Sequence, residues 1–259
     1  MHSALILDDV AARLARSRRV LFITGAGISA DSGLPTYRGV GGLYDGELTE
    51  EGLPIEAVLS GEMFAMRPEI TWKYLAEIER TCRGARPNAA HLAIAALERL
   101  LGNVLVFTQN VDGLHRAAGS RRLIEVHGNL HELVCTACDF GERVDNLAGR
   151  RLPPECPACG ALLRPNVVLF GEALPAEAID CLLEELGAGM DMVFTIGTSG
   201  AFPYIAEPVL WAAQAGIPTV EINPQPTRLT PCVSHHVQLG AADAMSALME
   251  RLAGRGMQI

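Results

Sequence analysis

Basic residues are in short supply in this chain of 259 residues. Lysine and arginine together number 21 against 30 aspartates and glutamates, which gives a formal net charge of -9 at pH 7. Nucleic-acid binding needs a basic face that neutralises phosphates, so direct contact with nucleic acid is not expected. An acidic surface favours basic partners instead, such as lysine-rich peptides.

Long apolar runs are also missing. No run approaches the roughly 18 consecutive apolar residues of a membrane-spanning helix, so no contact with a membrane is expected. The first residues include Asp8 and Asp9, where a signal peptide would have a basic region, and this predicts a cytoplasmic protein. The seven cysteines are an odd number, which favours thiols or a metal site over a disulfide framework.

The chain does contain short apolar runs that alternate with helical patterns. The predicted strands cover residues 20–24, 104–107, 123–126, 167–170, 192–196, 219–222 and 237–240. Helices are expected within residues 4–17, 54–85, 87–100, 175–187, 204–215 and 241–252. Short buried strands that alternate with helices are typical of a parallel sheet with crossover connections. The fold class is therefore predicted to be α/β.

Segments made mostly of small or polar residues follow four of the predicted strands. They are Gly25-Ala26-Gly27-Ile28, Gln109-Asn110-Val111-Asp112, Gly197-Thr198-Ser199 and Asn223. Such a sheet binds its ligand beyond the carboxyl ends of its strands, so these segments predict one shared site. Residues 25–30 also fit the dinucleotide pattern G-x-G-x-x-A, in which glycines let a pyrophosphate approach the backbone.

Purely structural roles would also account for these segments. Asn110 and Asp112 could instead cap the helix that follows them, as such residues often do. The long helix and second strand of an ordinary dehydrogenase do not follow residues 25–30, because Gly33 and Pro35 interrupt any helix. The glycine-rich residues 35–53 are either a lid over a cofactor or a plain surface loop.

A histidine lies at the end of the predicted strand 123–126. Histidine has the unperturbed pKa nearest neutrality, so His127, which precedes Gly128, is the candidate general base. His91, near the start of the helix in residues 87–100, is expected to pack or cap that helix rather than to act in catalysis.

Four cysteines form two C-x2-C pairs, which are separated by 17 residues. They are Cys135, Cys138, Cys156 and Cys159. This spacing predicts Zn2+ held by four thiolates. Such a site has no open coordination position, so its role should be structural. The other cysteines, Cys82, Cys181 and Cys232, lack paired spacing and are expected to be buried thiols.

In combination, these motifs resemble the sirtuin family, the NAD-dependent protein deacylases. The resemblance covers roughly residues 10 to 252. It rests on residues 25–29 with Tyr37-Arg38-Gly39, 108–115, His127-Gly128, the four cysteines, Pro165 to Val168, Phe170-Gly171-Glu172, Gly197-Thr198-Ser199 and Ile222-Asn223.

The resemblance implies a Rossmann-like domain and a smaller domain. The Rossmann-like NAD-binding domain would be discontinuous, formed by residues 1–36, 86–130 and 163–259. Residues 37–85 would form a helical module with a cofactor-binding flap, and residues 131–162 a zinc-binding module. NAD and an acyl-lysine peptide would enter the cleft between the two domains.

The resemblance also implies a role for each matching residue. His127 would be the general base, with Asn110 and Asp112 beside it in catalysis. The substrate backbone would pair with Val168, Phe170, Gly171 and Glu172 by strand addition. The residues that would contact NAD are Gly25, Ala26, Gly27, Ile28, Tyr37, Arg38, Gln109, Asn110, Asp112, Gly197, Thr198, Ser199 and Asn223.

The implied reaction consumes NAD as a co-substrate. The acyl oxygen attacks the ribose and expels nicotinamide; His127 then deprotonates a ribose hydroxyl, which attacks the acyl carbon. Water completes release of lysine and O-acetyl-ADP-ribose. Members that remove succinyl or malonyl groups carry a Tyr and an Arg three residues apart, where this chain has Leu75 and Ile78. Burying an unpaired carboxylate is costly, so a preference for neutral acyl groups, acetyl first, is expected.

Departures and competing functions are also visible in the sequence. Tyr37 stands where the family usually has Phe, and Gly200 and Phe202 alter the second wall of the peptide groove. A mono-ADP-ribosyltransferase on the same scaffold would share the NAD residues. A non-catalytic zinc-ribbon module and a dehydrogenase are weaker alternatives. The sequence leaves the protein substrate and the oligomeric state open, and a monomer is compatible with it.

Overall fold

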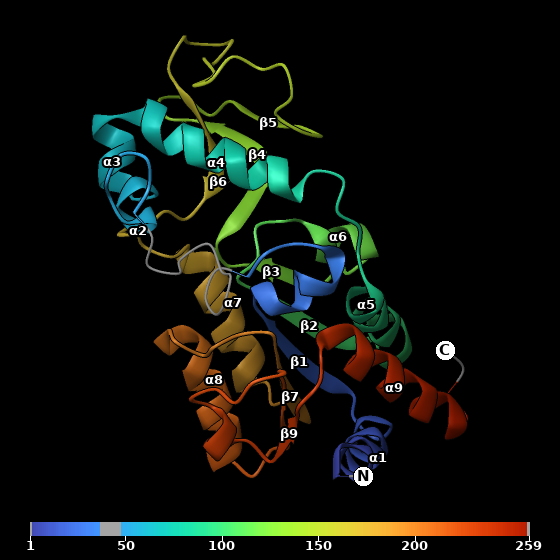
Figure 1. Ribbon diagram of the computed structural model, residues 1–259. Helices are drawn as coiled ribbons and strands as arrows, with labels where there is room; N and C mark the ends of the chain where they lie inside the picture. Colours follow the sequence, from blue (N-terminus) through green and yellow to red (C-terminus); the bar gives the residue numbers. More distant parts are fainter. Residues whose placement is uncertain (1, 37–47, 258–259) are drawn as a thin grey trace.

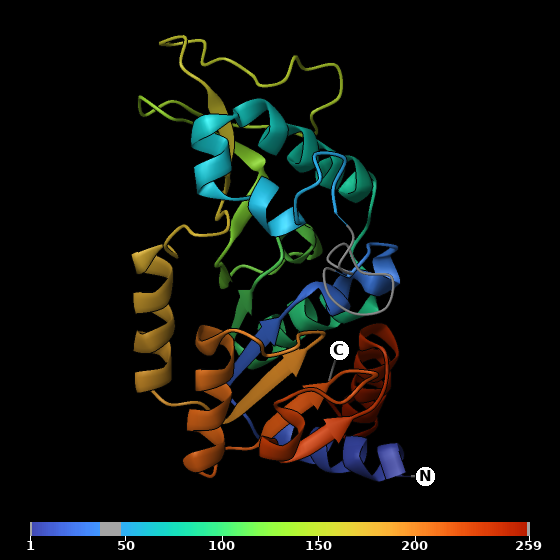
Figure 2. The same cartoon turned by 60° about the vertical axis from the view of Figure 1, so that its left-hand side comes forward.

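The computed structural model describes residues 2–36 and 48–257, and the chain forms a large and a small lobe (Figures 1 and 2). In the described residues, the large lobe holds a six-stranded parallel sheet with the order β3-β2-β1-β7-β8-β9. Its strands are β1 (Arg19–Thr24), β2 (Asn103–Thr108), β3 (Leu123–Glu125), β7 (Met192–Ile196), β8 (Thr219–Ile222) and β9 (His235–Val237). The predicted α/β class is confirmed.

Helices pack on both faces of this sheet. One face carries α1 (His2–Leu14), α5 (Ala89–Leu101) and α9 (Ala241–Gly254), and the other carries α7 (Ala176–Gly187) and α8 (Pro203–Gln214). In β1, Phe22 belongs to the first core while Leu21 and Ile23 belong to the second. Side chains of a strand alternate between its two faces, and here both faces are buried. Successive positions along it are therefore apolar, which explains the continuous apolar runs.

The start of α5 shows how the sequence sets a helix boundary. The side chain of Asn88 accepts the N–H of Ala90, and His91 Nδ1 accepts the N–H of Asn88, which completes a capping box. At the other end, Gly102 adopts φ 77°, in the left-handed region where glycine is favoured. The predicted capping role of His91 is confirmed.

In residues 48–85 and 128–167, the small lobe combines three helices with a three-stranded antiparallel sheet of order β5-β4-β6. The helices are α2 (Ile55–Val58), α3 (Gly61–Met66) and α4 (Pro68–Cys82), and the strands are β4 (Gly128–Cys135), β5 (Gly141–Arg143) and β6 (Leu163–Val167). Trp72 of α4 is fully buried, and its indole N–H donates to the carbonyl of Leu163 at 3.0 Å. The helices and the sheet therefore share one core.

Several expectations from the sequence need correction. The strand expected at 167–170 is instead β6, which ends at Val167 and pairs with β4 in the small lobe rather than in the parallel sheet. The last strand of the large sheet is His235–Val237 rather than 237–240. Cys181 and Cys232 are exposed, not buried, because they lie on solvent-facing positions of α7 and of the short helix η2 (Thr230–Cys232). Cys82 is partly buried.

The last short elements connect these layers. The 3-10 helix η1 (Ala26–Ser32) directly follows β1, and α6 (Leu114–Ala118) follows β2. The predicted zinc-binding module covers residues 131–162. The three-stranded sheet of the small lobe extends beyond both limits, because β4 begins at Gly128 and β6 covers Leu163–Val167. Within the described residues, no helix combines the length and the apolar character needed to cross a membrane.

Candidate active site

The turns that follow β1, β2, β7 and β8 line a cleft of about 1210 Å³. The cleft lies where the carboxyl ends of the strands face the small lobe, as expected for a doubly wound sheet. Most of the predicted site residues line it. These are Gly25, Ala26, Gly27, Gln109, Asn110, His127, Val168, Phe170, Gly171, Glu172, Gly197, Thr198, Ser199 and Asn223.

The glycines after β1 lie against the turn that follows β7. The N–H of Gly27 donates to the carbonyl of Gly197 at 2.9 Å. A Cβ on Gly27 would lie 2.6 Å from the Cα of Gly197, and Gly197 itself has φ +60°. Glycine is therefore required by the close approach of two backbones. The side chain of Ile28 is buried in the core, so this predicted NAD residue can offer only its backbone.

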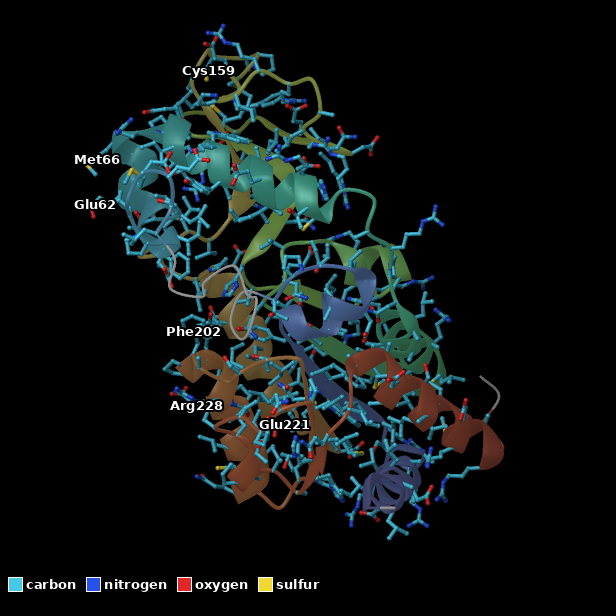
Figure 3. The ribbon with its side chains drawn as sticks, viewed as in Figure 1. Glu62, Met66, Cys159, Phe202, Glu221 and Arg228 are labelled. Carbon is cyan, nitrogen blue, oxygen red and sulfur yellow. The ribbon has the colours of Figure 1, made fainter. Side chains whose placement is uncertain are left out.

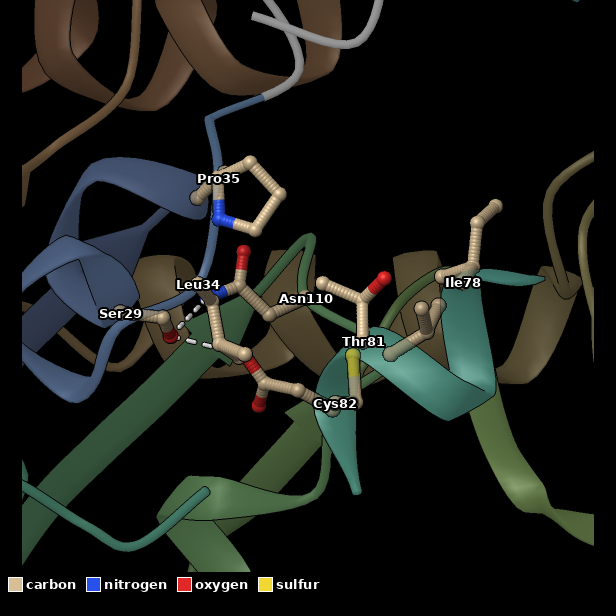
Figure 4. Close-up of a pocket in the computed structure, with 10 residues that line it drawn as sticks. Ser29, Leu34, Pro35, Ile78, Thr81, Cys82 and Asn110 are labelled. Atoms are coloured by element: carbon tan, nitrogen blue, oxygen red, sulfur yellow. Dashed lines mark hydrogen bonds between the residues drawn. The ribbon is translucent and has the colours of Figure 1, made fainter. Parts of the chain in front are cut away.

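An amide and a carboxylate after β2 meet η1 at Ser29. Asn110 Nδ2 donates to Ser29 Oγ at 3.2 Å, and Ser29 Oγ donates to Asp112 Oδ2 at 2.7 Å. The three side chains border a small cavity of about 20 Å³, with Pro35 and Cys82 on its rim (Figure 4). In the described residues, Asn110 Oδ1 is buried without a hydrogen-bond partner.

This unpartnered oxygen fits a ligand amide. A buried acceptor without a partner is costly, and the NH2 group of a carboxamide would satisfy it. The nicotinamide end of NAD carries such a group, so the residues present fit NAD. Asn110 lines both the small cavity and the larger cleft, and only the larger cleft has room for NAD.

Asp112 has two roles in the structure. Its Oδ1 accepts the N–H of Leu114, the first residue of α6, at 2.9 Å, so the capping interpretation holds for Asp112 but not for Asn110, whose Oδ1 accepts no hydrogen bond from the described part of the chain. Burial raises the pKa of Asp112 above its usual value, while the hydrogen bonds from Leu114 and Ser29 oppose the shift.

The other polar residues of the cleft hold neighbouring turns together. Gln109 Nε2 donates to Thr198 Oγ1 at 2.9 Å, and Asn223 Nδ2 donates to the carbonyl of Thr198 at 3.3 Å. Thr198 therefore joins the ends of β2, β7 and β8. Tyr37 and Arg38, predicted on the flap, lie outside the described residues.

His127 follows β3 and its ring reaches the cleft. Its Nδ1 lies 2.9 Å from the carbonyl oxygen of Gln109. A carbonyl only accepts, so Nδ1 carries the proton and Nε2 keeps its lone pair. Burial lowers the pKa of His127. The ring is thus the neutral form that a general base requires.

The Nε2 atom of His127 has a partner that the sequence did not suggest. Tyr204, in the first turn of α8, lies with its hydroxyl 2.7 Å from this nitrogen. Tyr204 also lines the cleft. The only sequence signal is its position, because it lies five residues after Ser199 in a turn that was already expected to face a ligand.

The predicted peptide-binding segment already pairs with the small lobe. The N–H of Phe170 donates to the carbonyl of Leu59, and the N–H of Gly61 donates to the carbonyl of Phe170, both at 3.0 Å. Glu172 forms an ion pair with Arg164 at 2.6 Å. The N–H and C=O of Phe170 are therefore already bonded. A substrate that adds as a strand would have to pair with the backbone of neighbouring residues.

The four cysteines of the small lobe come together. Their sulfurs lie within 4.8 Å of one another, with 3.5 Å between those of Cys135 and Cys159 and 3.7 Å between those of Cys138 and Cys156. Zn–S bonds of about 2.3 Å in a tetrahedron place sulfurs about 3.8 Å apart, so the set fits Zn2+. Cys159 lies far from Phe202 at the cleft (Figure 3), which agrees with a structural role.

The model of the Sir2 family matches residues 25–202. This chain belongs to the Sir2 family. An NAD-dependent protein deacylase 2 of Pseudomonas aeruginosa is 53% identical over 256 residues, which cover 97% of this chain and 99% of that protein.

Two solved Sir2 complexes show the same fold. A Sir2 homolog–NAD complex matches with a TM-score of 0.85 at 36% identity, over 95% of this chain and 94% of the other. A Sir2–p53 peptide–NAD+ complex matches with a TM-score of 0.81 at 29% identity, over 95% and 98%. The Rossmann-like sheet domain with a smaller two-module lobe is thus the Sir2 fold.

Proposed function

We propose that this Sir2-family chain is an NAD-dependent protein lysine deacetylase, which transfers the acetyl group to ADP-ribose and releases nicotinamide. One observation carries the proposal. A neutral histidine, His127, and a buried amide with an unsatisfied oxygen, Asn110, border the same cleft as a glycine turn. An ordinary dehydrogenase would also follow this turn with a long helix, whereas here the short helix η1 ends at Ser32 and Gly33 and Pro35 follow.

NAD binds along the carboxyl edge of the sheet in this proposal. The turn Gly25-Ala26-Gly27, with the backbone of Ile28, approaches the pyrophosphate, and Asn110 accepts a hydrogen bond from the carboxamide. Gly197, Thr198, Ser199 and Asn223 take the adenosine half. Gln109 and Asp112 complete the nicotinamide-ribose side, and Tyr37 and Arg38 cover the cofactor from the flap.

The acyl-lysine peptide enters between the lobes beside Val168, Phe170, Gly171 and Glu172. The Sir2–p53 peptide complex supports a peptide substrate for this fold. His127 then removes a proton from the sugar hydroxyl that attacks the acyl carbon. Zn2+ on Cys135, Cys138, Cys156 and Cys159 holds the small lobe in shape. A cytoplasmic location and a monomer stay predictions.

The acyl end of the cleft is apolar. Leu75 and Ile78 of α4 both line it, together with Leu59, Leu130 and Leu169. No lysine or arginine lines the cleft in the described residues, and its acidic lining residues are Asp31 and Glu172. Lys73 is held elsewhere by Glu50 and Glu51. A dicarboxylic acyl group would be buried here without a cationic partner, which is costly.

The preference between neutral and charged acyl groups can be measured directly. On one peptide that carries either acetyl- or succinyl-lysine, acetyl should have the higher kcat/KM, by tenfold or more, about 1.4 kcal/mol at the transition state. Ile78→Arg should move the ratio towards succinyl, because it adds the missing cation. A tenfold succinyl preference of the natural chain would refute the assignment.

Loss of the base tests the reaction itself. His127→Ala should lower deacetylation by about 10²–10⁴-fold, while nicotinamide exchange and NAD binding persist. Mass spectrometry should find O-acetyl-ADP-ribose with the natural protein. ADP-ribosylated protein in its place would indicate a mono-ADP-ribosyltransferase, and turnover near that of the natural protein in the variant would exclude His127 as the base.

A further inference from the structure

The proton-accepting atom of the proposed base is already engaged. His127 Nδ1–H donates to Gln109, so Nε2 has one lone pair, and the hydroxyl of Tyr204 donates to it at 2.7 Å. A second donor cannot use the same lone pair. A sugar hydroxyl that reached His127 directly would first have to break this hydrogen bond.

The phenol oxygen can accept a proton as well as donate one. While its O–H points at His127, its own lone pairs remain available on the side of the cleft, which Tyr204 lines beside His127. The ring is held in place, because it stacks on Phe202 with centroids 5.5 Å apart and meets the His127 ring edge-on at 6.0 Å.

We propose that Tyr204 is a catalytic residue that relays the proton of the attacking sugar hydroxyl to His127. This inference rests on the proposed deacetylase function. The sugar O–H proton passes to Tyr204 Oη as the Tyr204 proton passes to His127 Nε2. When the acyl oxygen has displaced nicotinamide, the acyl carbon is double-bonded to the lysine nitrogen as an imidate. The electron pair left on the sugar oxygen forms the bond to this carbon, and the C=N π pair moves to the lysine nitrogen.

The relay leaves both residues ready for the next step. Tyr204 ends neutral and protonated, and His127 ends as the imidazolium, which still donates from Nδ1 to Gln109. Burial raises the pKa of Tyr204 to about 12, so the phenol stays protonated and passes a proton without ionising. The hydrogen bond does not have to break before the chemistry.

Tyr204→Phe removes only the hydroxyl. It should lower kcat for deacetylation about 10²-fold or more, as expected for a lost acid–base group, with KM for NAD and for the acetyl-peptide unchanged. Nicotinamide exchange should persist, because nicotinamide leaves before the base acts. Tyr74→Phe is the matched control, since its hydroxyl bonds Glu51 in the small lobe, and it should leave kcat unchanged.

The ligand-free protein offers a readout besides activity. In 15N NMR, the His127 Nε2 resonance of Tyr204→Phe should move towards that of a nitrogen without a hydrogen bond, and Tyr74→Phe should not move it. In a His127→Ala background, Tyr204→Phe should cost nothing further, because the relay has lost its end point.

The outcomes separate the relay from its alternatives. An unchanged or higher kcat in Tyr204→Phe would mean that the hydroxyl only covers the base, and the relay would be refuted. An equal fall in exchange and deacetylation would mean a structural role and would refute it too. If the natural protein itself fails to deacetylate, the proposed function fails, whatever the variant does.

Discussion

Two histidines buried behind the active site should make the fold sensitive to mild acid. His91 of α5 and His115 of α6 are 0% and 2% exposed, and their rings meet edge-on with centroids 4.8 Å apart. Burial lowers their pKa values to about 4 and about 3. In the described residues, His91 Nε2 and His115 Nδ1 have no hydrogen-bond partner.

Acid should lower the free energy of unfolding, because the unfolded chain binds protons at these histidines more readily than the folded chain does. Well above pH 6.5, for example at pH 7.5, these histidines are almost entirely neutral in both the folded and the unfolded chain, so they hardly affect stability. Below 6.5 the unfolded chain gains protons that the folded chain refuses, so the free energy of unfolding falls until the folded pKa values are reached. One pH unit below 6.5, each histidine should cost roughly 1 kcal/mol, and the pair roughly 2–3 kcal/mol.

His91→Gln provides the test. Glutamine can still accept the N–H of Asn88 in the capping box, but it does not titrate. Urea unfolding of both zinc-loaded proteins at pH 7.5 and 5.5 should show that the variant loses roughly 1 kcal/mol less than the natural chain. Taking the difference between the two proteins cancels the other titrating groups. Equal losses in the two proteins would refute the reasoning.

Two further perturbations address the zinc lobe and the glycine turn. Cys135→Ser should release zinc and lower the melting temperature, because structural zinc binding contributes folding free energy; zinc at full occupancy with unchanged melting would contradict this, and Cys181→Ser, an exposed cysteine outside the set, is the control. In Gly27→Ala the added Cβ would meet Gly197. We expect NAD binding, measured by titration calorimetry, to weaken about tenfold or more. The free energy of unfolding should fall by about 1–3 kcal/mol, the usual cost of overpacking. Gly187→Ala, where nothing lies within 4 Å, should leave NAD binding unchanged, and equal effects from both substitutions would contradict the steric argument.

The apolar runs predicted the four central strands of the large sheet well because β1, β2, β7 and β8 are buried on both faces. The same signal misled at residues 167–170. Those residues are apolar because they cross between the lobes: Val168 bonds the carbonyl of His127, and Phe170 bonds Leu59 and Gly61. A short apolar run indicates burial, but it does not say against which element the residues are buried.

The site was predicted from residue types at strand ends, and this signal has limits. The glycines after β1 fit a phosphate turn, yet the structure adds a separate reason, their contact with Gly197. The sequence cannot distinguish the two reasons. Tyr204 was missed because its importance depends on which way a side chain leaves the first turn of α8, and spacing alone does not fix that direction.

The turn after β2 links the parts of the site, and its backbone and side chains do so separately. The carbonyl of Gln109 fixes the tautomer of His127, while the amide of the same residue bonds Thr198. The tautomer therefore does not depend on the side chain at position 109, whereas the join between the ends of β2 and β7 does. Asn110 and Asp112 then meet at Ser29. Residues 109–112 thus orient the proposed base, place the buried amide oxygen of Asn110 and cap α6. This is why these four residues held most of the functional information in the sequence.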